Sequence, residues 1–159
     1  PLPAGLASAP ALGPHESPLQ TYLSRAAQRA ADVFGVPLAT VTRRLDEGGL
    51  IQECAGSSSW TLDADQVELT EGSPLWHVMN TGQRLLIKDI AREPAFAGEQ
   101  PLRFDGFMFL AAVPLRDADE QVMGVLAIHD SKPRLLGPSD IKLLEEMAGD
   151  LSASMPPPG

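Results

Sequence analysis

The chain has 159 residues, of which 43% are hydrophobic, as is ordinary for one globular domain with its own core. Its 12 basic and 21 acidic residues give a formal charge of -9, which repels phosphate backbones and anionic membranes. We therefore expect no nucleic-acid or membrane partner. The single cysteine, Cys54, excludes an internal disulfide framework and fits a reducing compartment, so we expect a cytoplasmic protein.

Proline is concentrated at both ends of the chain. Five of the first 18 residues are proline, and residues 156–158 are three more. These segments show no apolar periodicity and are typical of linkers. We expect residues 1–16 to be a disordered linker, residues 17–155 to be a single domain and residues 156–159 to be a tail.

The first predicted element is a helix. Ser17 is a good cap for its start, with Pro18 at the first helical position, and Gly35 with Pro37 is typical of its end. An apolar stripe with a spacing of four and three residues runs along it. The stripe consists of Leu19, Leu23, Ala26, Ala30 and Val33.

Two strands follow this helix. Residues 38–45 and 50–55 have strand character, and the turn sequence Asp-Glu-Gly-Gly at 46–49 predicts that they form a hairpin. Residues 56–71 are polar and poorly periodic, so no element is predicted there.

A short helix comes next, with Ser73 as its cap, Pro74 at its first position and Gly82 as its stop. Residues 84–88 predict a short strand. The prolines and glycines of residues 92–106 indicate a loop or a broken helix.

The last third of the chain holds the strongest strands. Residues 107–115 and 121–129 are separated by a short polar connection, so they should pair antiparallel. A final helix opens at Gly137 and Pro138, and its stripe consists of Ile141, Leu144, Ala148, Leu151 and Met155. The order of elements predicts an α+β fold with an antiparallel sheet of about five to six strands and the terminal helices on one face.

Several segments resemble a GAF domain. They are Ser-Pro-Leu-Trp at 73–76, Thr-Gly-Gln at 81–83, Pro-Leu-Arg-Asp at 114–117, Val-Met-Gly-Val-Leu-Ala-Ile at 122–128 and Lys-Pro-Arg at 132–134. The resemblance spans residues 19–151. It implies that loops and short helices cover a small-molecule pocket on the second face of the sheet. It also implies a sensory module, attached to histidine kinases, cyclic-dinucleotide enzymes or similar effectors, that forms homodimers through its terminal helices.

Specialised members of that family need chemistry that this sequence lacks. Cys54 lies outside the region where bilin-binding relatives attach their chromophore, and one cysteine cannot complete the cycle of the free methionine sulfoxide reductases. The signature of cyclic-nucleotide-binding members is also absent. We therefore expect no catalytic residue, and a GAF-fold enzyme of the reductase type is the least favoured alternative. Cys54 itself reads either as a redox switch or, more simply, as a small buried hydrophobe.

Metal binding rests on two histidines. His77 and His129 can approach the same pocket, and Asp89 or Asp130 can add a carboxylate, which together suit a non-haem iron. The simpler interpretation is that His77 is a solvated helix residue and that His129 is a strand-end residue with an ordinary hydrogen bond. We predict no metal and no cofactor, although an unidentified small ligand is compatible with the fold.

The ligand site is predicted from strand alternation and from the covering segments. In related GAF domains the position of Phe109 tends to look toward the ligand, so we select its face of the strand. The candidate ligand-binding residues are Trp76, Met79, Phe96, Arg103, Phe107, Phe109, Ala111 and His129. The alternative is that these side chains only fill a core.

The candidate dimer interface consists of the stripes on the terminal helices. Its residues are Leu19, Leu23, Ala26, Ala30, Ile141, Leu144, Ala148 and Leu151. The alternative is that these stripes pack on the sheet of their own chain. We predict a non-catalytic regulatory module that couples ligand binding or dimer geometry to an effector domain or partner protein, as in two-component systems. A purely structural dimerisation domain is the alternative function.

Overall fold

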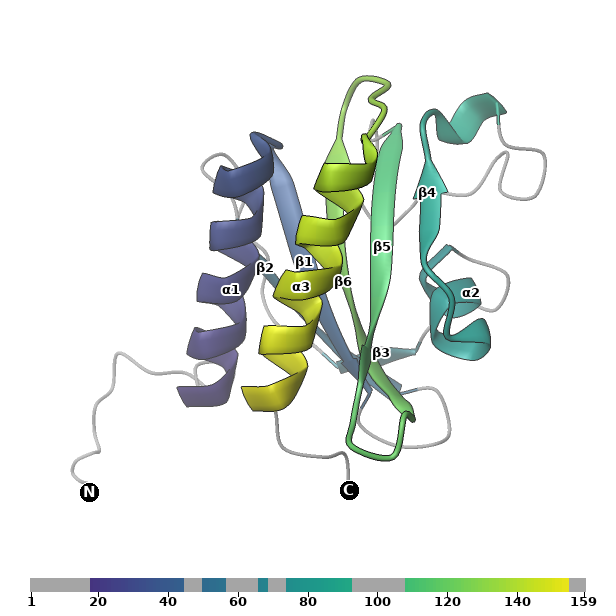
Figure 1. Ribbon diagram of the computed structural model, residues 1–159. Coiled ribbons are helices and arrows are strands. Elements are labelled where there is room, and N and C mark those ends of the chain that lie inside the picture. Colours follow the sequence, from purple (N-terminus) through teal and green to yellow (C-terminus); the bar gives the residue numbers. More distant parts are fainter. Residues whose placement is uncertain (1–17, 45–49, 57–65, 69–73, 93–107, 155–159) are drawn as a thin grey trace.

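A six-stranded antiparallel sheet forms the centre of the protein (Figure 1). The computed structural model describes residues 18–44, 50–56, 66–68, 74–92 and 108–154. The strand order is β3-β2-β1-β6-β5-β4. The strands are β1 (Leu38–Arg44), β2 (Leu50–Gly56), β3 (Gln66–Glu68), β4 (Leu85–Ile87), β5 (Phe109–Arg116) and β6 (Val122–Asp130).

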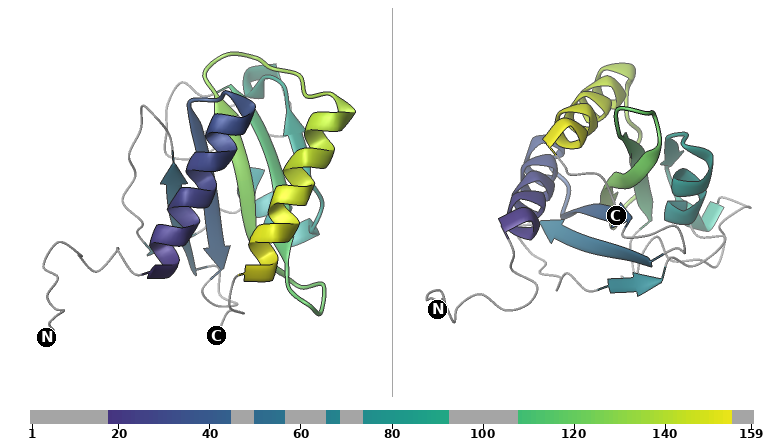
Figure 2. Two further views of the ribbon diagram at one scale, coloured as in Figure 1. Left: turned by 60° about the vertical axis from the view of Figure 1, so that its left-hand side comes forward. Right: turned by 90° about the horizontal axis from the view of Figure 1, so that it is seen from below.

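Two long helices cover one face of this sheet, and a short helix covers the other (Figures 1 and 2). The helices are α1 (Pro18–Phe34), α2 (Pro74–Thr81), the 3-10 helix η1 (Ile90–Arg92) and α3 (Pro138–Ser154). The long helices α1 and α3 lie side by side and run in opposite directions. The first turn of α1 and the last turn of α3 therefore lie at the same end of the molecule (Figure 1). This arrangement confirms the predicted α+β class.

The larger core lies between the sheet and the two long helices. Leu23 of α1 and Leu144 of α3 are fully buried there, against strand residues such as Phe109 and Ile128. Every buried residue of this cluster is hydrophobic. Burial of each large side chain contributes roughly 1.5–3 kcal/mol, so this cluster supplies much of the stability.

A smaller core lies under α2. It joins the buried face of α2 to β4, β5 and β6, and consists of Leu75, Val78, Met79, Ile87, Ile90, Leu110, Ala112, Val125 and Ala127. Strand alternation separates the two cores, because successive side chains of β5 and β6 point to opposite faces of the sheet.

The helix ends lie where glycine allows the chain to turn. Gly35 has a φ of 65° after α1, and Gly82 has a φ of 70° after α2. Positive φ costs glycine little, so both residues end their helices as C-terminal caps. The Gly82 amide donates to the Val78 carbonyl at 2.8 Å, which satisfies one of the last carbonyls of α2. Both ends agree with the sequence prediction.

Two features differ from the predicted elements. The strand β3 was not predicted, because Gln66, Val67 and Glu68 contain one apolar residue and give no alternation to detect. The last hairpin begins at Phe109 rather than at residue 107, which lies outside the described residues. Residues 1–17 and 155–159 also lie outside them, so the predicted linker and tail stay predictions. Within the described part of the chain, no helix has the length and apolar character needed to cross a membrane.

Candidate functional site

The face of the sheet beneath α2 carries an unusual set of buried polar side chains. Thr40, Thr42 and His129 are each 0% exposed. The register aligns Thr40 with Ala127 and Thr42 with Val125 across the β1–β6 pair, so both threonines share the face of the α2 core. His129 follows Ala127 by two residues on β6 and faces the same way.

Thr40 and His129 are joined by a hydrogen bond. The distance from Thr40 Oγ1 to His129 Nε2 is 3.0 Å. The neighbouring Thr42 Oγ1 has no hydrogen-bond partner among the residues that the structure describes. An unsatisfied buried hydroxyl costs roughly 1–3 kcal/mol. A ligand group that bonded to Thr42 would recover that energy.

Burial makes the imidazole of His129 neutral at physiological pH. Desolvation lowers the pKa of His129 from 6.5 to about 3, because the charged form loses its hydration in the interior. A neutral imidazole presents one donor and one acceptor. His129 therefore contributes no positive charge to this face of the sheet.

The sequence analysis selected the wrong face of β5 for the side of the sheet under α2. Phe109 and Ala111 belong to the core under α1 and α3, and Ala111 lies opposite Ile128 of that same core. The residues that face α2 are their neighbours Leu110 and Ala112. The strand shows the same apolar character on both faces, so its composition alone could not assign the side. His129 is on the predicted face of the sheet, but it does not share that face with Phe109 and Ala111.

The covering residues that were predicted are only partly described. Met79 is 5% exposed and packs into the α2 core, whereas Trp76 on the same helix is half-buried. Phe96, Arg103 and Phe107 lie outside the described residues. Thr40 and Thr42 were not predicted as site residues, because threonine is also a common strand former. Their alternation with Ala39 and Val41 along β1 was the available signal.

One of the two carboxylates considered for a metal site, that of Asp130, forms an ion pair instead. Asp130 lies opposite Phe109 in the β5–β6 register, on the other side of the sheet from His129. Its Oδ2 lies 3.1 Å from Arg134 Nε in an ion pair. Among the described residues, no group of three or more His, Cys, Asp or Glu side chains is placed to hold a metal ion.

The predicted dimer stripes mostly lie inside the chain's own core. Leu23, Ala30, Leu144, Ala148 and Leu151 are each at most 3% exposed. They pack in the core of their own chain, which is the alternative given above for these stripes. A stripe of this spacing serves a helix on a sheet as well as a helix pair. Ala26 and Ile141 are half-buried, and the side chain of Leu19 lies outside the described part.

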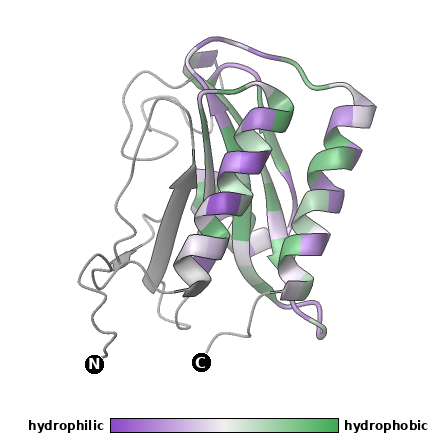
Figure 3. Ribbon diagram, turned by 90° about the vertical axis from the view of Figure 1, so that its left-hand side faces the viewer, coloured by the Kyte–Doolittle hydropathy of each residue, from purple (hydrophilic) through white to green (hydrophobic). Residues whose placement is uncertain are grey.

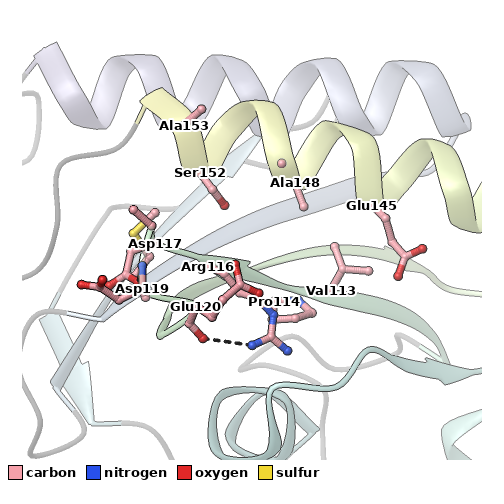
Figure 4. Close-up of a pocket in the computed structure, with 13 residues that line it drawn as sticks. Val113, Pro114, Arg116, Asp117, Asp119, Glu120, Glu145, Ala148, Ser152 and Ala153 are labelled. Atoms are coloured by element: carbon pink, nitrogen blue, oxygen red, sulfur yellow. Dashed lines mark hydrogen bonds between the residues drawn. The ribbon is translucent and has the colours of Figure 1, made fainter.

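Two grooves lie on the side of the long helices. One, of about 800 Å³, lies between the β5–β6 hairpin and the second half of α3 (Figure 4). Its walls carry Asp117, Asp119 and Glu120 on the hairpin side and the small residues Ala148 and Ser152 on α3. The other, of about 320 Å³, lies between α1 and α3. Sequence reasoning identified neither groove, because each depends on how two separate elements pack.

Comparisons with known proteins agree with this geometry. The sequence model of the GAF domain family matches residues 18–155. A comparison with curated proteins gives no match.

Three solved structures illustrate the similarity in fold. The GAF domain of an Acinetobacter phosphoenolpyruvate-protein phosphotransferase has 17% identity and a TM-score of 0.69, with 87% of this chain and 82% of that chain covered. Residues 122 to 287 of a methyl-accepting chemotaxis protein have 16% identity and a TM-score of 0.67, with 85% of each chain covered. The PixJ GAF domain of Thermosynechococcus elongatus, in its blue-light-absorbing form, has 17% identity and a TM-score of 0.64, with 85% and 83% covered. At these identities the similarity shows the fold alone.

Proposed function

This chain belongs to the GAF domain family, and we propose that it is a non-catalytic sensor module of a signal-transduction protein. Structurally similar solved domains come from a phosphoenolpyruvate-protein phosphotransferase, a methyl-accepting chemotaxis protein and the cyanobacteriochrome receptor PixJ. The proposed input is a small molecule bound under α2. The proposed output passes through the terminal helices to an effector domain or a partner protein.

The observation that carries the proposal is the polar row of Thr40, Thr42 and His129. On the face under α1 and α3, the buried polar residue among those described is Asp130, and it is paired with Arg134. Burying polar groups costs free energy unless they form hydrogen bonds. Thr40 and His129 are hydrogen-bonded to each other, whereas the Thr42 hydroxyl has no partner among the described residues, which is explained if a neutral polar group of a ligand meets Thr42.

The arrangement of the helices supports the proposed output. The first turn of α1 and the last turn of α3 lie at the same end of the molecule (Figure 1). A change in the relative position of the two helices would therefore move both of these helix ends together. A ligand changes such an equilibrium only by binding one arrangement more tightly than the other. The proposed mechanism is therefore a shift in population between two helix arrangements.

We propose a homodimer as the signalling unit, with a contact surface formed by exposed apolar residues of α1 and α3 in place of the buried residues of the predicted stripes. Val33 on α1 is 49% exposed, and Leu143 on α3 is 39% exposed. Both lie toward the end of the molecule where α1 ends and α3 begins (Figure 1). Exposed apolar side chains on neighbouring helices are the residues that a second copy would cover.

A structural dimerisation domain is the second candidate. Val78, Leu110 and Ala127 are 0% exposed, so α2 packs closely on its side of the sheet. That packing is also what a filled pocket would show. The two candidate functions predict different effects of replacing Thr42, since only the sensor uses the Thr42 hydroxyl to bind a ligand.

Mass spectrometry of the protein purified without added ligand tests the proposal. We expect the native spectrum to show a discrete extra mass that is lost on denaturation. Thr42→Val should reduce the occupancy of that mass, whereas Thr21→Val, the same change at an exposed position on α1, should leave it unchanged.

A different pattern would favour the structural alternative. The wild-type protein would then carry no extra mass, and Thr42→Val would raise the free energy of unfolding by about 1 kcal/mol by removing an unsatisfied hydroxyl. That combination would contradict the sensor.

A further inference from the structure

The groove between α1 and α3 combines an apolar floor with two arginines on one wall. Leu126 of β6 and Leu151 of α3 line it at 1% and 3% exposure. Ala26 and Met147 complete its apolar lining, and its volume is about 320 Å³. Cavities of this size hold small ligands. Ala26 is the reason that the groove is open, because a larger side chain at this position would fill it.

The charged residues of the groove are unevenly placed. Tyr22, Arg25 and Arg29 come from α1, at spacings of three and four residues that put them on one face of the helix. Asp150 of α3 lines the opposite wall. Among the described residues, no side chain within ion-pair distance neutralises either arginine, Asp150 included. Two exposed guanidinium groups beside apolar surface are unusual in a chain of charge -9.

The two arginines indicate the chemistry of an occupant. A guanidinium group binds a carboxylate through two parallel hydrogen bonds, and this pairing is among the strongest polar contacts in proteins. The apolar floor behind the arginines suits an alkyl or aryl chain, and Tyr22, which is 42% exposed, can lie along it. Both groups are present at one groove, so the ligand should carry both.

We propose that the groove between α1 and α3 is a binding site for a small amphiphilic carboxylate, with its chain on Leu126 and Leu151 and its carboxylate on Arg25 and Arg29. The site lies on the opposite face of the sheet from Thr40 and His129. It is therefore independent of the proposed ligand under α2. Because the groove is lined by residues of both long helices, its occupant would contact both helices and influence their relative position.

Octanoate and 1-octanol form a matched pair of probes, since they share chain length and differ in charge. Titration of each into isotopically labelled protein, followed by amide chemical shifts, gives the affinity and locates the site. We expect octanoate to bind roughly tenfold more tightly than octanol, from the charge-assisted hydrogen bonds. The shifts should centre on α1 and α3.

Three variants test the site itself. Arg25→Gln with Arg29→Gln should reduce octanoate affinity to that of octanol, and Ala26→Trp should abolish binding of both. Arg92→Gln, at an arginine on η1 whose side chain is 87% exposed, is the matched control and should bind as the wild type does.

The opposite results overturn the proposal. Equal affinities for octanoate and octanol in the wild type would show that the arginines do not recognise a carboxylate. Shifts centred on α2 would place the probe at the other face. A dimer that Ala26→Trp converts to a monomer, with no octanoate binding by the wild type, would assign the groove to a second copy of the chain.

Discussion

At the scale of single residues, His129 makes the folded state sensitive to acid. Its pKa is lowered from 6.5 to about 3 by burial, so between these values the unfolded chain binds a proton that the folded chain does not. Lowering the pH below 6.5 therefore favours unfolding, by up to roughly 1.4 kcal/mol for each pH unit from this residue. Its contribution becomes constant about one pH unit above 6.5, where the imidazole is neutral in both states.

Removal of the imidazole should remove this part of the pH dependence. Urea unfolding of the wild type should show a loss of free energy between about pH 7.5 and pH 5 that is roughly 2 kcal/mol larger than the loss for His129→Gln. Above pH 7.5 the two proteins should change in parallel. Equal losses between pH 7.5 and pH 5 would show that His129 is accessible to protons in the folded state.

The same residue shows how far the sequence could predict the site. His129 could be selected because a histidine among apolar strand residues is conspicuous. Phe109 could not be assigned to a face, because β5 is apolar on both sides and its face is decided only by the helices that pack against it. Thr42 becomes notable only when its hydroxyl is seen to be buried without a partner among the described residues.

At the scale of elements, Arg134 joins the segment before α3 to the end of β6 and to the end of α1, which is about 100 residues away in sequence. Its Nη1 donates to the Phe34 carbonyl at 2.7 Å and its Nη2 to the Gly35 carbonyl at 3.2 Å, at the end of α1. Its Nε donates to Asp130 Oδ2 at 3.1 Å, at the end of β6. A cation also interacts favourably with the C-terminal end of a helix. The segment before α3 is thus fastened to both α1 and the sheet.

Arg134→Ala should therefore be costly. The Asp130 side chain is 4% exposed and would remain buried without its partner, so we expect a loss of roughly 3 kcal/mol or more in the free energy of unfolding by urea. Arg84→Ala is the control, because its ion pair with Glu145 is about half exposed and is worth at most about 1 kcal/mol. If both variants lost the same amount, the three contacts of Arg134 would not act as a fastening.

Elements with local signals could be predicted, and those without them could not. The ends of α1 and α2 follow from Gly35 and Gly82, whose positive φ was implied by their position after an apolar stripe. The stripe of α1 predicted a buried face but not its partner, since Leu23 would be equally apolar against a sheet or another helix. The strand β3 depends on its pairing with β2 and left no local pattern.

At the scale of the whole molecule, the exposed apolar residues of the long helices decide whether the chain forms the proposed dimer. Figure 3 shows hydrophilic and hydrophobic residues alternating along α1 and α3 on the outer side of the helix layer. Leu143 is 39% exposed on this layer, and Leu86 is 40% exposed on the edge strand β4. The two leucines match in type and exposure but lie on different elements.

Leu143→Glu should therefore shift the protein from dimer to monomer, because it would place a charge in a desolvated interface between two acidic chains. Sedimentation velocity should show this shift for Leu143→Glu and for Val33→Glu, whereas Leu86→Glu should remain a dimer. Thermal unfolding of all three should stay cooperative, since each side chain is already partly exposed to water in one chain. A wild-type monomer, or dissociation by Leu86→Glu alone, would move the contact away from the helix layer. In that case the terminal helices could still carry a signal within one chain, but the partner that reads it would have to be a different protein.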